Sequence, residues 1–384
     1  MPDSPPGLMT MLSQLIAAPS VSSINAQWDQ SNRGVIELLS GWLEDVGFRV
    51  EVLELANAPG KYNLVASAGR GTEGMILSGH TDTVPCDEQL WASDPFRLSE
   101  RDGRLYGLGT ADMKSFFALA IEAVRKFDLK QLKQPLVLLA TADEESTMCG
   151  ARSLVESGRH LGRHALIGEP TGLRPVRMHK GITMETIRLF GRSGHSSNPA
   201  LGVSALEGMH RAIGEILDWR SELQQRYRNP LFEVEVPTLN LGHIHGGDNP
   251  NRICGQCELQ IDLRPLPGMD IAALRAELSQ RLERLFESSG LRLELSTPFG
   301  GIPATETPAD AAIVRAIENL TGARAGAVAF GTEAPYLNQL GAETVILGPG
   351  DIEQAHQPDE YLSLARIAPM IDTLQAVIRR FCLA

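Results

Sequence analysis

Four stretches of this chain are apolar and then stop at, or shortly before, residues of the kinds that bind metal ions. They begin at Met75, Pro135, Ala165 and Thr344 and lead to His80, to Glu144 and Glu145, to Glu169 and to His356. A short continuous apolar run is typical of a strand buried on both faces of an α/β sheet. Because ligand sites of open α/β sheets lie beyond the carboxyl ends of the strands, we expect these side chains to converge on one cleft.

The rest of the first half alternates helical and strand-like patterns. Apolar residues at helical spacing predict helices over 7–18, 31–46 and 113–127, and strand patterns cover 49–55, 63–68 and 75–80. This alternation predicts an α/β fold, with a mostly parallel sheet that is covered by helices on both faces.

The pattern changes after Glu169. Polar and apolar residues then alternate over 181–190, 233–244 and 257–263, as in antiparallel strands with one exposed face, and helices are expected over 203–227 and 271–288. With 384 residues, two domains are expected. We predict a discontinuous catalytic domain formed by residues 1–180 and 291–384, and a smaller inserted α+β domain of ferredoxin-like type over residues 181–290.

Composition excludes several classes of protein. Hydrophobic residues make up 43% and charged residues 21%, as in a soluble globular protein. The net charge is -12, and without a basic stripe a nucleic-acid partner is not expected. No apolar run is long enough to cross a membrane, and no cationic segment of a secretory signal opens the chain. Five cysteines, an odd number, favour reduced thiols and a cytoplasmic location.

Each candidate metal ligand has an ordinary alternative when taken alone. His80 fits a strand-end histidine bonded to Asp82, Asp112 fits a helix N-cap, the two adjacent glutamates fit a solvated turn, and His356 fits a surface loop. The apolar run before the glutamates argues against a solvated turn, because it places two repelling carboxylates next to a buried sheet. The joint occurrence of all these residues favours a metal site.

The number of donors favours two metal ions. The five candidates are His80, Asp112, Glu145, Glu169 and His356. A catalytic metal usually takes three protein ligands, so five ligands with one shared carboxylate suit two ions roughly 3.5–4 Å apart. Asp112, in a glycine-rich loop, has both oxygens free for such sharing. Asp82 is positioned to accept the second ring N–H of His80, and a glutamate that does not ligate is free to move a proton.

Two other motifs are weaker evidence for a functional site. Cys254 and Cys257 form a CxxC pair, but no second pair completes a zinc ribbon, and a strand rather than a helix follows. Ser193, His195 and Ser197 suggest a serine hydrolase, yet the Gly-x-Ser-x-Gly turn between strand and helix is missing. We interpret the cysteines as structural thiols and the serines as turn and capping residues.

Together the motifs resemble the M20 metallopeptidases. The matching segments are His-Thr-Asp-Thr-Val-Pro at 80–85, Gly-x-Gly-x-x-Asp-Met-Lys at 107–114, Glu-Glu at 144–145, Gly-Glu-Pro-Thr at 168–171 and Gly-His-Ser-Ser at 194–197. Segments 246–254, 264–269, 331–335 and 347–361 are similar to the subgroup that converts N2-acetyl-L-ornithine to L-ornithine and acetate in arginine biosynthesis. The resemblance covers nearly the whole chain.

The resemblance implies a metal-dependent amide hydrolase with two zinc ions, for which cobalt often substitutes. Asp112 would bridge the ions, with His80 and Glu169 on one and Glu145 and His356 on the other. Glu144 would be the general base and Asp82 would orient His80. A cis peptide bond is implied after Asp112.

The resemblance further implies a homodimer formed through the inserted domain. His195 would stabilise the oxyanion, either in its own subunit or in the partner's, and Asn251 and Arg264 would hold the substrate carboxylate. We add Glu333 as a candidate partner for the cationic side chain of the substrate, because it lies in a subgroup segment near His356.

Other functions remain open at this stage. Within the family these are a succinyl-diaminopimelate desuccinylase, an aminoacylase or a dipeptidase, and a desuccinylase would need an additional cationic residue. A non-catalytic binding protein is disfavoured because neither Glu144 nor any ligand is missing. A two-metal phosphoesterase is disfavoured because Lys114 is almost the only basic residue near the acidic motifs.

Overall fold

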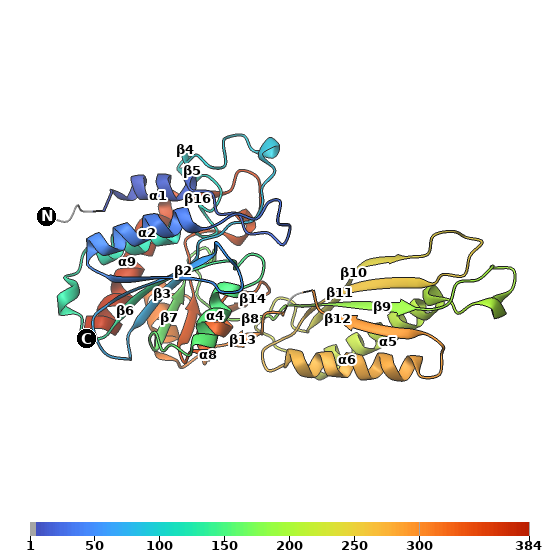
Figure 1. Ribbon diagram of the computed structural model, residues 1–384. Helices are drawn as coiled ribbons and strands as arrows, with labels where there is room; N and C mark the ends of the chain where they lie inside the picture. The colour runs from blue at the N-terminus through green and yellow to red at the C-terminus, as the bar shows by residue number, and fades with distance from the viewer. Residues whose placement is uncertain (1–4, 299, 384) are drawn as a thin grey trace. The chain divides into compact units, whose positions relative to one another are not determined.

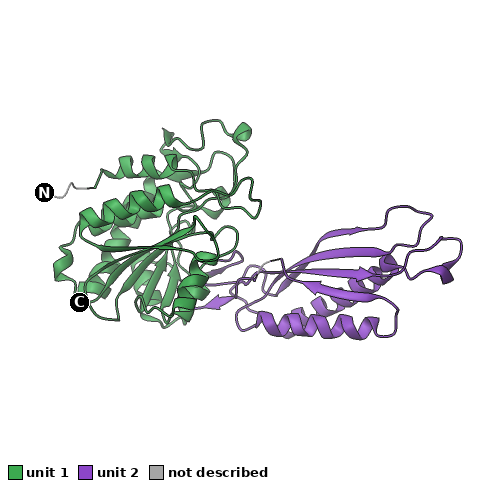
Figure 2. Cartoon of the chain, in the orientation of Figure 1, with its two compact units in different colours: residues 1–177, 307–326, 332–384 green, residues 178–306, 327–331 purple. Residues whose placement is uncertain are grey.

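The computed structural model describes residues 5–298 and 300–383, which divide into two compact units. Unit 1 consists of the chain up to Arg177, Thr307–Gly326 and the chain from Thr332 onward (Figure 2). Unit 2 consists of Met178–Glu306 and Ala327–Gly331. The second unit thus extends past the expected boundary at residue 290, because strand β12 (Arg292–Ser296) pairs with β9 (Thr183–Phe190).

The large sheet has four parallel strands at its centre. Its order is β1-β2-β6-β3-β7-β15-β8-β13, with β14 paired to β8. Strands β6, β3, β7 and β15 run parallel, whereas the flanking pairs are antiparallel. The strands are β1 (Arg49–Glu54), β2 (Tyr62–Ala68), β3 (Met75–His80), β6 (Leu136–Thr141), β7 (His164–Ile167), β8 (Val176–His179), β13 (Thr305–Glu306), β14 (Gly326–Val328) and β15 (Glu343–Ile346). A separate small sheet joins β4 (Ser99–Arg101), β5 (Arg104–Tyr106) and β16 (Tyr361–Ser363).

Helices cover both faces of the central strands, which explains their continuous apolar sequences. Leu77 pairs with Leu138 and Leu166, and all three pack into the core formed with helices α1 (Leu8–Ala17), α2 (Arg33–Val46), α3 (Ser115–Val124), α7 (Ala312–Thr321) and α9 (Ile367–Ile378). Their neighbours Ile76 and Val137 are buried on the opposite face. Helices α4 (Cys149–Ser157) and α8 (Ala334–Gln339) pack together (Figure 1). Helix α8 also packs on β15.

Unit 2 has the order of elements β-α-β-β-α-β. They are β9, α5 (Ala205–Arg226), β10 (Thr238–Gly246), β11 (Gln256–Arg264), α6 (Ile271–Phe286) and β12. The antiparallel sheet order β10-β11-β9-β12 is that of a ferredoxin-like fold. Apolar side chains of one sheet face, such as Ile187 and Leu259, pack with Trp219 of α5 and Leu278 of α6. The predicted fold class is confirmed for both sheets. Among the described residues, no helix has the length and apolarity that a membrane crossing requires.

Candidate metal centre

Adjacent parallel strands deliver the first donors to one edge of the large sheet. His80 is the last residue of β3 and pairs with Thr141, the last residue of β6. Glu144 and Glu145 follow β6 after a turn, and Glu169 follows β7, the other neighbour of β3. The convergence expected at the carboxyl ends of buried strands is therefore present.

Asp112 lies between two histidines that are distant in sequence. Its Oδ1 is 3.0 Å from Nε2 of His80, and its Oδ2 is 3.5 Å from Nε2 of His356. The same atom of His356 is 3.1 Å from Oε1 of Glu145, and Nε2 of His80 is 3.8 Å from Oε1 of Glu169. The five donors thus form two groups that share one carboxylate. The peptide bond between Asp112 and Met113 is cis.

Glu144 lies next to this arrangement. Ligand atoms of His80, Glu144 and Glu169 all lie within 4.8 Å of one another, as do those of His80, Asp112 and Glu145. His356 belongs to neither of these tight groups, and its side chain is 51% exposed, so it approaches from the solvent side.

The electrostatics of the centre match a site for cations. Burial, followed by neighbouring carboxylates, raises the pKa of both Glu144 and Glu169 well above the usual range. Burial opposes charge on His80, but Asp112 and nearby carboxylates raise its pKa, and hydrogen bonds to Asp112 and Glu145 raise the pKa of His356 to about 10. Burial and mutual repulsion therefore disfavour negative charge on Glu144 and Glu169, while the carboxylates favour positive charge on the two histidines. Oε1 of Glu169 is buried without a hydrogen-bond partner. Divalent cations would supply the missing positive charge, so the donor set fits them.

Asp82 makes different contacts from those expected. Nδ1 of His80 donates to the backbone carbonyl of Asp82 at 3.0 Å, whereas the Asp82 carboxylate is 3.8 Å away. That carboxylate instead accepts hydrogen bonds from the backbone N–H groups of Glu144 (3.3 Å) and Glu145 (3.1 Å). Asp82 therefore holds the histidine with its main chain and the glutamate turn with its side chain.

The glutamate turn has a second support that sequence reasoning missed. Asp143, just before Glu144, has a positive φ of 56°, and its carbonyl accepts the backbone N–H groups of Thr147 and Met148. Its carboxylate pairs with the buried Lys61 at 2.7 Å, and Lys61 also pairs with Asp29 at 2.6 Å. Because Lys61 and Asp29 are distant in sequence, no local pattern indicates this contact.

Glu333 lies at the start of α8 and is 1% exposed. Thr141 donates to its Oε2 at 2.8 Å, and burial raises its pKa to about 7. In this structure the carboxylate faces the protein interior near the end of β6 rather than solvent.

The remaining candidates belong to unit 2 and lie at opposite ends of its sheet. His195 pairs with Arg252 in an isolated bridge, and the N–H of Ser196 donates to the carbonyl of Asn251 at 3.0 Å, so His195 and Asn251 are on adjacent loops. Both residues are exposed. Arg264 ends β11 and pairs with Asp262 at 2.9 Å. The nine residues of β11 span about 27 Å, which separates Arg264 from the loop of His195.

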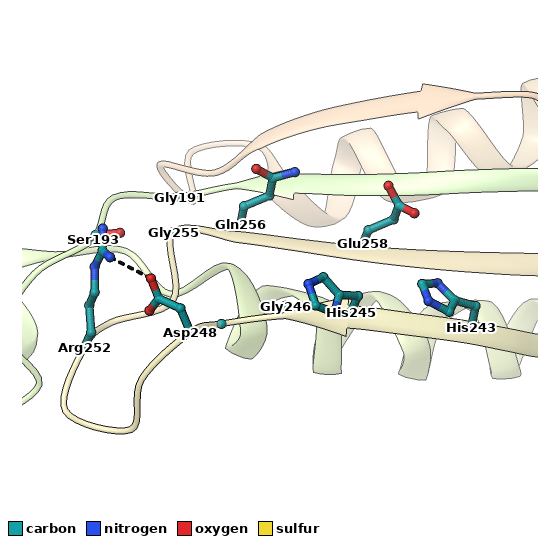
Figure 3. A pocket seen from close by; sticks show the side chains of 11 residues that line it. Gly191, Ser193, His243, His245, Gly246, Asp248, Arg252, Gly255, Gln256 and Glu258 are labelled. Atoms are coloured by element: carbon teal, nitrogen blue, oxygen red, sulfur yellow. Dashed lines mark hydrogen bonds and ion pairs between the residues drawn. The ribbon is translucent and has the colours of Figure 1, made fainter.

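These loops border a polar hollow of about 550 Å³ in unit 2. Figure 3 shows Ser193, Gln256 and Glu258 on one side and the β10 histidines on the other, with Asp248 joined to Arg252. The Arg252–Asp248 contact is 2.6 Å and spans the loop that carries Asn251.

Comparison with known proteins identifies close relatives. The model of peptidase family M20/M25/M40 matches residues 76–380. The acetylornithine deacetylase of Edwardsiella ictaluri is 52% identical over 377 residues, which cover 98% of each chain. That of Pasteurella multocida is 48% identical with the same coverage. Among solved structures, an aminopeptidase PepT from Bacillus cereus aligns with a TM-score of 0.75 at 21% identity, covering 97% of this chain and 98% of the other.

Proposed function

The chain belongs to peptidase family M20/M25/M40, and we propose that it hydrolyses N2-acetyl-L-ornithine to L-ornithine and acetate. It is a metal-dependent amide hydrolase, and relatives named for this deacetylation match almost its full length. The observation that carries the chemistry is Asp112, whose two oxygens face histidines of two different donor groups. The product and the relatives support a place in cytoplasmic arginine biosynthesis.

The donors divide naturally between two ions. His80 and Glu169 would hold one cation, Glu145 and His356 the other, and Asp112 would bridge them. Two Zn²⁺ ions suit this nitrogen and oxygen set, and Co²⁺ would substitute. When bound, such a pair lowers the pKa of a water toward neutrality and polarises a substrate carbonyl.

Glu144 is proposed as the proton carrier. The attacking water forms a bond to the amide carbon and gives its proton to the Glu144 carboxylate, which passes it to the leaving nitrogen as the C–N bond breaks. Asp82 supports this role because its carboxylate holds the backbone of Glu144 and Glu145. His195 is proposed to donate a hydrogen bond to the developing oxyanion.

The geometry of unit 2 supports a homodimer. His195 and Asn251 lie at one end of its sheet and Arg264 at the other, about 27 Å apart along β11. A fully extended acetylornithine is only about 10 Å long, by the dimensions of an extended chain. If all three residues contact one substrate, they come from two copies of the chain. Unit 2 would then be the dimerisation domain.

A metal-dependent substrate panel tests the proposal. Chelator-treated protein is assayed with N2-acetyl-L-ornithine, N-succinyl-diaminopimelate and neutral N-acetyl amino acids, before and after addition of Zn²⁺ or Co²⁺. We expect activity only after metal addition and the highest kcat/KM for acetylornithine. A preference for the succinyl substrate, or full activity without metal, would contradict the assignment.

Glu333 is proposed to recognise the cationic side chain, which requires its buried carboxylate to become accessible to the substrate. The Glu333→Gln variant is compared with the native protein on acetylornithine and on acetylnorvaline, which lacks the terminal amine. We expect the preference for acetylornithine to fall. An unchanged ratio of the two kcat/KM values would remove Glu333 from substrate recognition.

A further inference from the structure

Glu360 is a buried acid close to the proposed metal centre that the mechanism above does not use. It lies four residues after His356 and is 1% exposed. Its Oε1 accepts the backbone N–H groups of Ala111 (2.7 Å) and Asp112 (3.0 Å), and its Oε2 accepts that of Gly109 (3.0 Å). Its own carbonyl accepts the N–H of Gly107 at 3.1 Å. One residue thus binds four backbone groups of the loop that presents Asp112.

We propose that Glu360 is a positioning residue that holds the Asp112 loop against the segment carrying His356, and so sets the spacing of the two cation sites. This inference rests on the proposed dinuclear function. The hydrogen bonds leave both Asp112 side-chain oxygens free to face His80 and His356. Because Glu360 and His356 are four residues apart, fixing one end of this segment restricts the approach of the other.

The loop is built to surround a carboxylate. Gly107 and Gly109 have φ values of 152° and 86°, which L side chains rarely adopt, and these turns aim successive N–H groups inward. A glutamine in place of Glu360 has one acceptor oxygen, and its amide nitrogen would face a backbone N–H with another donor. Only a carboxylate satisfies all three donors through its side chain.

The neighbouring residues also fit a fixed anion. Lys114, a basic residue two positions after Asp112, is 1% exposed. Its Nζ donates to the carbonyl of Ala18 at 3.1 Å. On the other side the backbone is closely packed, since a Cβ on Gly350 would be 2.4 Å from the carbonyl oxygen of Ala111. The backbone at Gly350, six residues before His356, therefore packs directly against the loop that presents Asp112.

The test measures cation binding to the metal-free protein rather than turnover. The Glu360→Gln variant is titrated with Zn²⁺ and with Co²⁺ in a calorimeter. We expect it to bind one cation with near-native affinity and the second with an affinity about 10–100-fold weaker. Glu360→Asp keeps the charge on a shorter stem and should recover part of the loss. Glu185→Gln is the matched control, because Glu185 is a buried, multiply hydrogen-bonded acid in unit 2 and should leave both affinities unchanged.

Different results would contradict the role of Glu360 and the proposed dinuclear function. Native affinity for both cations in Glu360→Gln would overturn the inference and leave the dinuclear enzyme intact. If Glu185→Gln weakened the affinity for both cations equally, the inference would also be overturned, because general destabilisation would then explain the weaker binding in Glu360→Gln. If Glu360→Gln does not fold, full second-site affinity in Glu360→Asp is the contradicting result. A native protein that binds one cation and turns over acetylornithine would contradict the dinuclear function itself.

Discussion

Adjacent carboxylates at the end of β6 have different surroundings, and this difference supports the roles proposed for them. Oε1 of Glu145 contacts His356 at 3.1 Å, whereas Glu144 lies near His80 and Glu169 without a hydrogen bond from its carboxylate to either. The backbone N–H groups of both glutamates bind the Asp82 carboxylate, which fixes the main chain from which the two side chains project. Glu145 is therefore suited to ligation and Glu144 to proton transfer.

Replacing Glu144 by glutamine should separate catalysis from metal binding. The amide keeps the shape of the side chain but cannot accept the proton of the attacking water. We expect kcat to fall by about 10²–10⁴-fold, the usual contribution of a general base, while two cations still bind. Steady-state kinetics and metal analysis of the same sample measure both quantities. A near-native kcat would show that another group carries the proton.

Single residues also show the limit of prediction from sequence. The five donors were expected to lie together, and in the structure they do, because each follows an apolar strand or a glycine-rich loop. The contacts that support them were not predicted. His80 donates its hydrogen bond to a backbone carbonyl rather than to the Asp82 carboxylate. Lys61 pairs with Asp143 from a distant segment, and Glu360 binds a loop about 250 positions away in the chain. Such contacts follow from tertiary packing, which local pattern does not specify.

At the level of elements, helix α3 comes very close to the residue that follows β7, between two of the proposed metal ligands. Asp112 precedes α3 and Glu169 follows β7, and Gly168 allows Phe116 of α3 to pack against the chain there. A Cβ at Gly168 would lie 2.1 Å from the ring of Phe116. This contact requires glycine for steric reasons, independently of any backbone angle.

Gly168→Ala should therefore destabilise the protein. Overpacking in a rigid core typically costs about 1–3 kcal/mol, and the shift of α3 should also weaken metal binding. Gly41→Ala is the control, because Gly41 is exposed within α2 and a methyl group added there would have no neighbour within 4 Å; it should be neutral or stabilise by about 0.5–1 kcal/mol. Denaturant unfolding measures both variants. Equal stability of Gly168→Ala and the native protein would show that Phe116 moves freely.

The elements were predicted well where their patterns were long. The buried strands and amphipathic helices of unit 1 appear near their expected bounds, and unit 2 has the expected alternating strands. The short strands β8, β13 and β14 were missed because two to four residues carry no clear period. Unit 2 extends beyond the expected boundary at residue 290 because β12 pairs with a strand about 100 residues earlier, and that pairing is not visible in local sequence.

For the whole molecule, buried acids give the metal-free form an unusual dependence on pH. Burial raises the pKa of Glu333 and of Glu360 to about 7, and that of Asp82 to about 6. An acid whose pKa is raised by folding contributes stability below its unfolded pKa and loses it as pH rises through its folded pKa. As the pH rises from about 4 to about 7, these three groups therefore lower the free energy of unfolding of the metal-free protein. The lowered pKa of Lys114 acts in the opposite direction, but mainly above pH 8.

Thermal unfolding of the chelator-treated protein should reveal this dependence. We expect the melting temperature to be lower by several degrees at pH 7.5 than at pH 5.5. Added Zn²⁺ should raise it more at pH 7.5, because a cation favours the deprotonated acids that burial disfavours. Scans at both values of pH, with and without metal, provide the comparison. A metal-free protein that is more stable at pH 7.5 would show that these acids are better solvated than their burial indicates.

The two ends of the unit 2 sheet predict an active site completed by two subunits, and mixed dimers test this directly. Glu144→Gln and His195→Ala should each lose most activity alone, the latter by about 10²–10³-fold. In a dimer containing one chain of each kind, the chain with native Glu144 receives His195 from its partner. One of its two sites is then intact, so random mixing should restore about one quarter of native activity. If His195 acts within its own chain, no mixed dimer contains a complete site and mixing restores nothing.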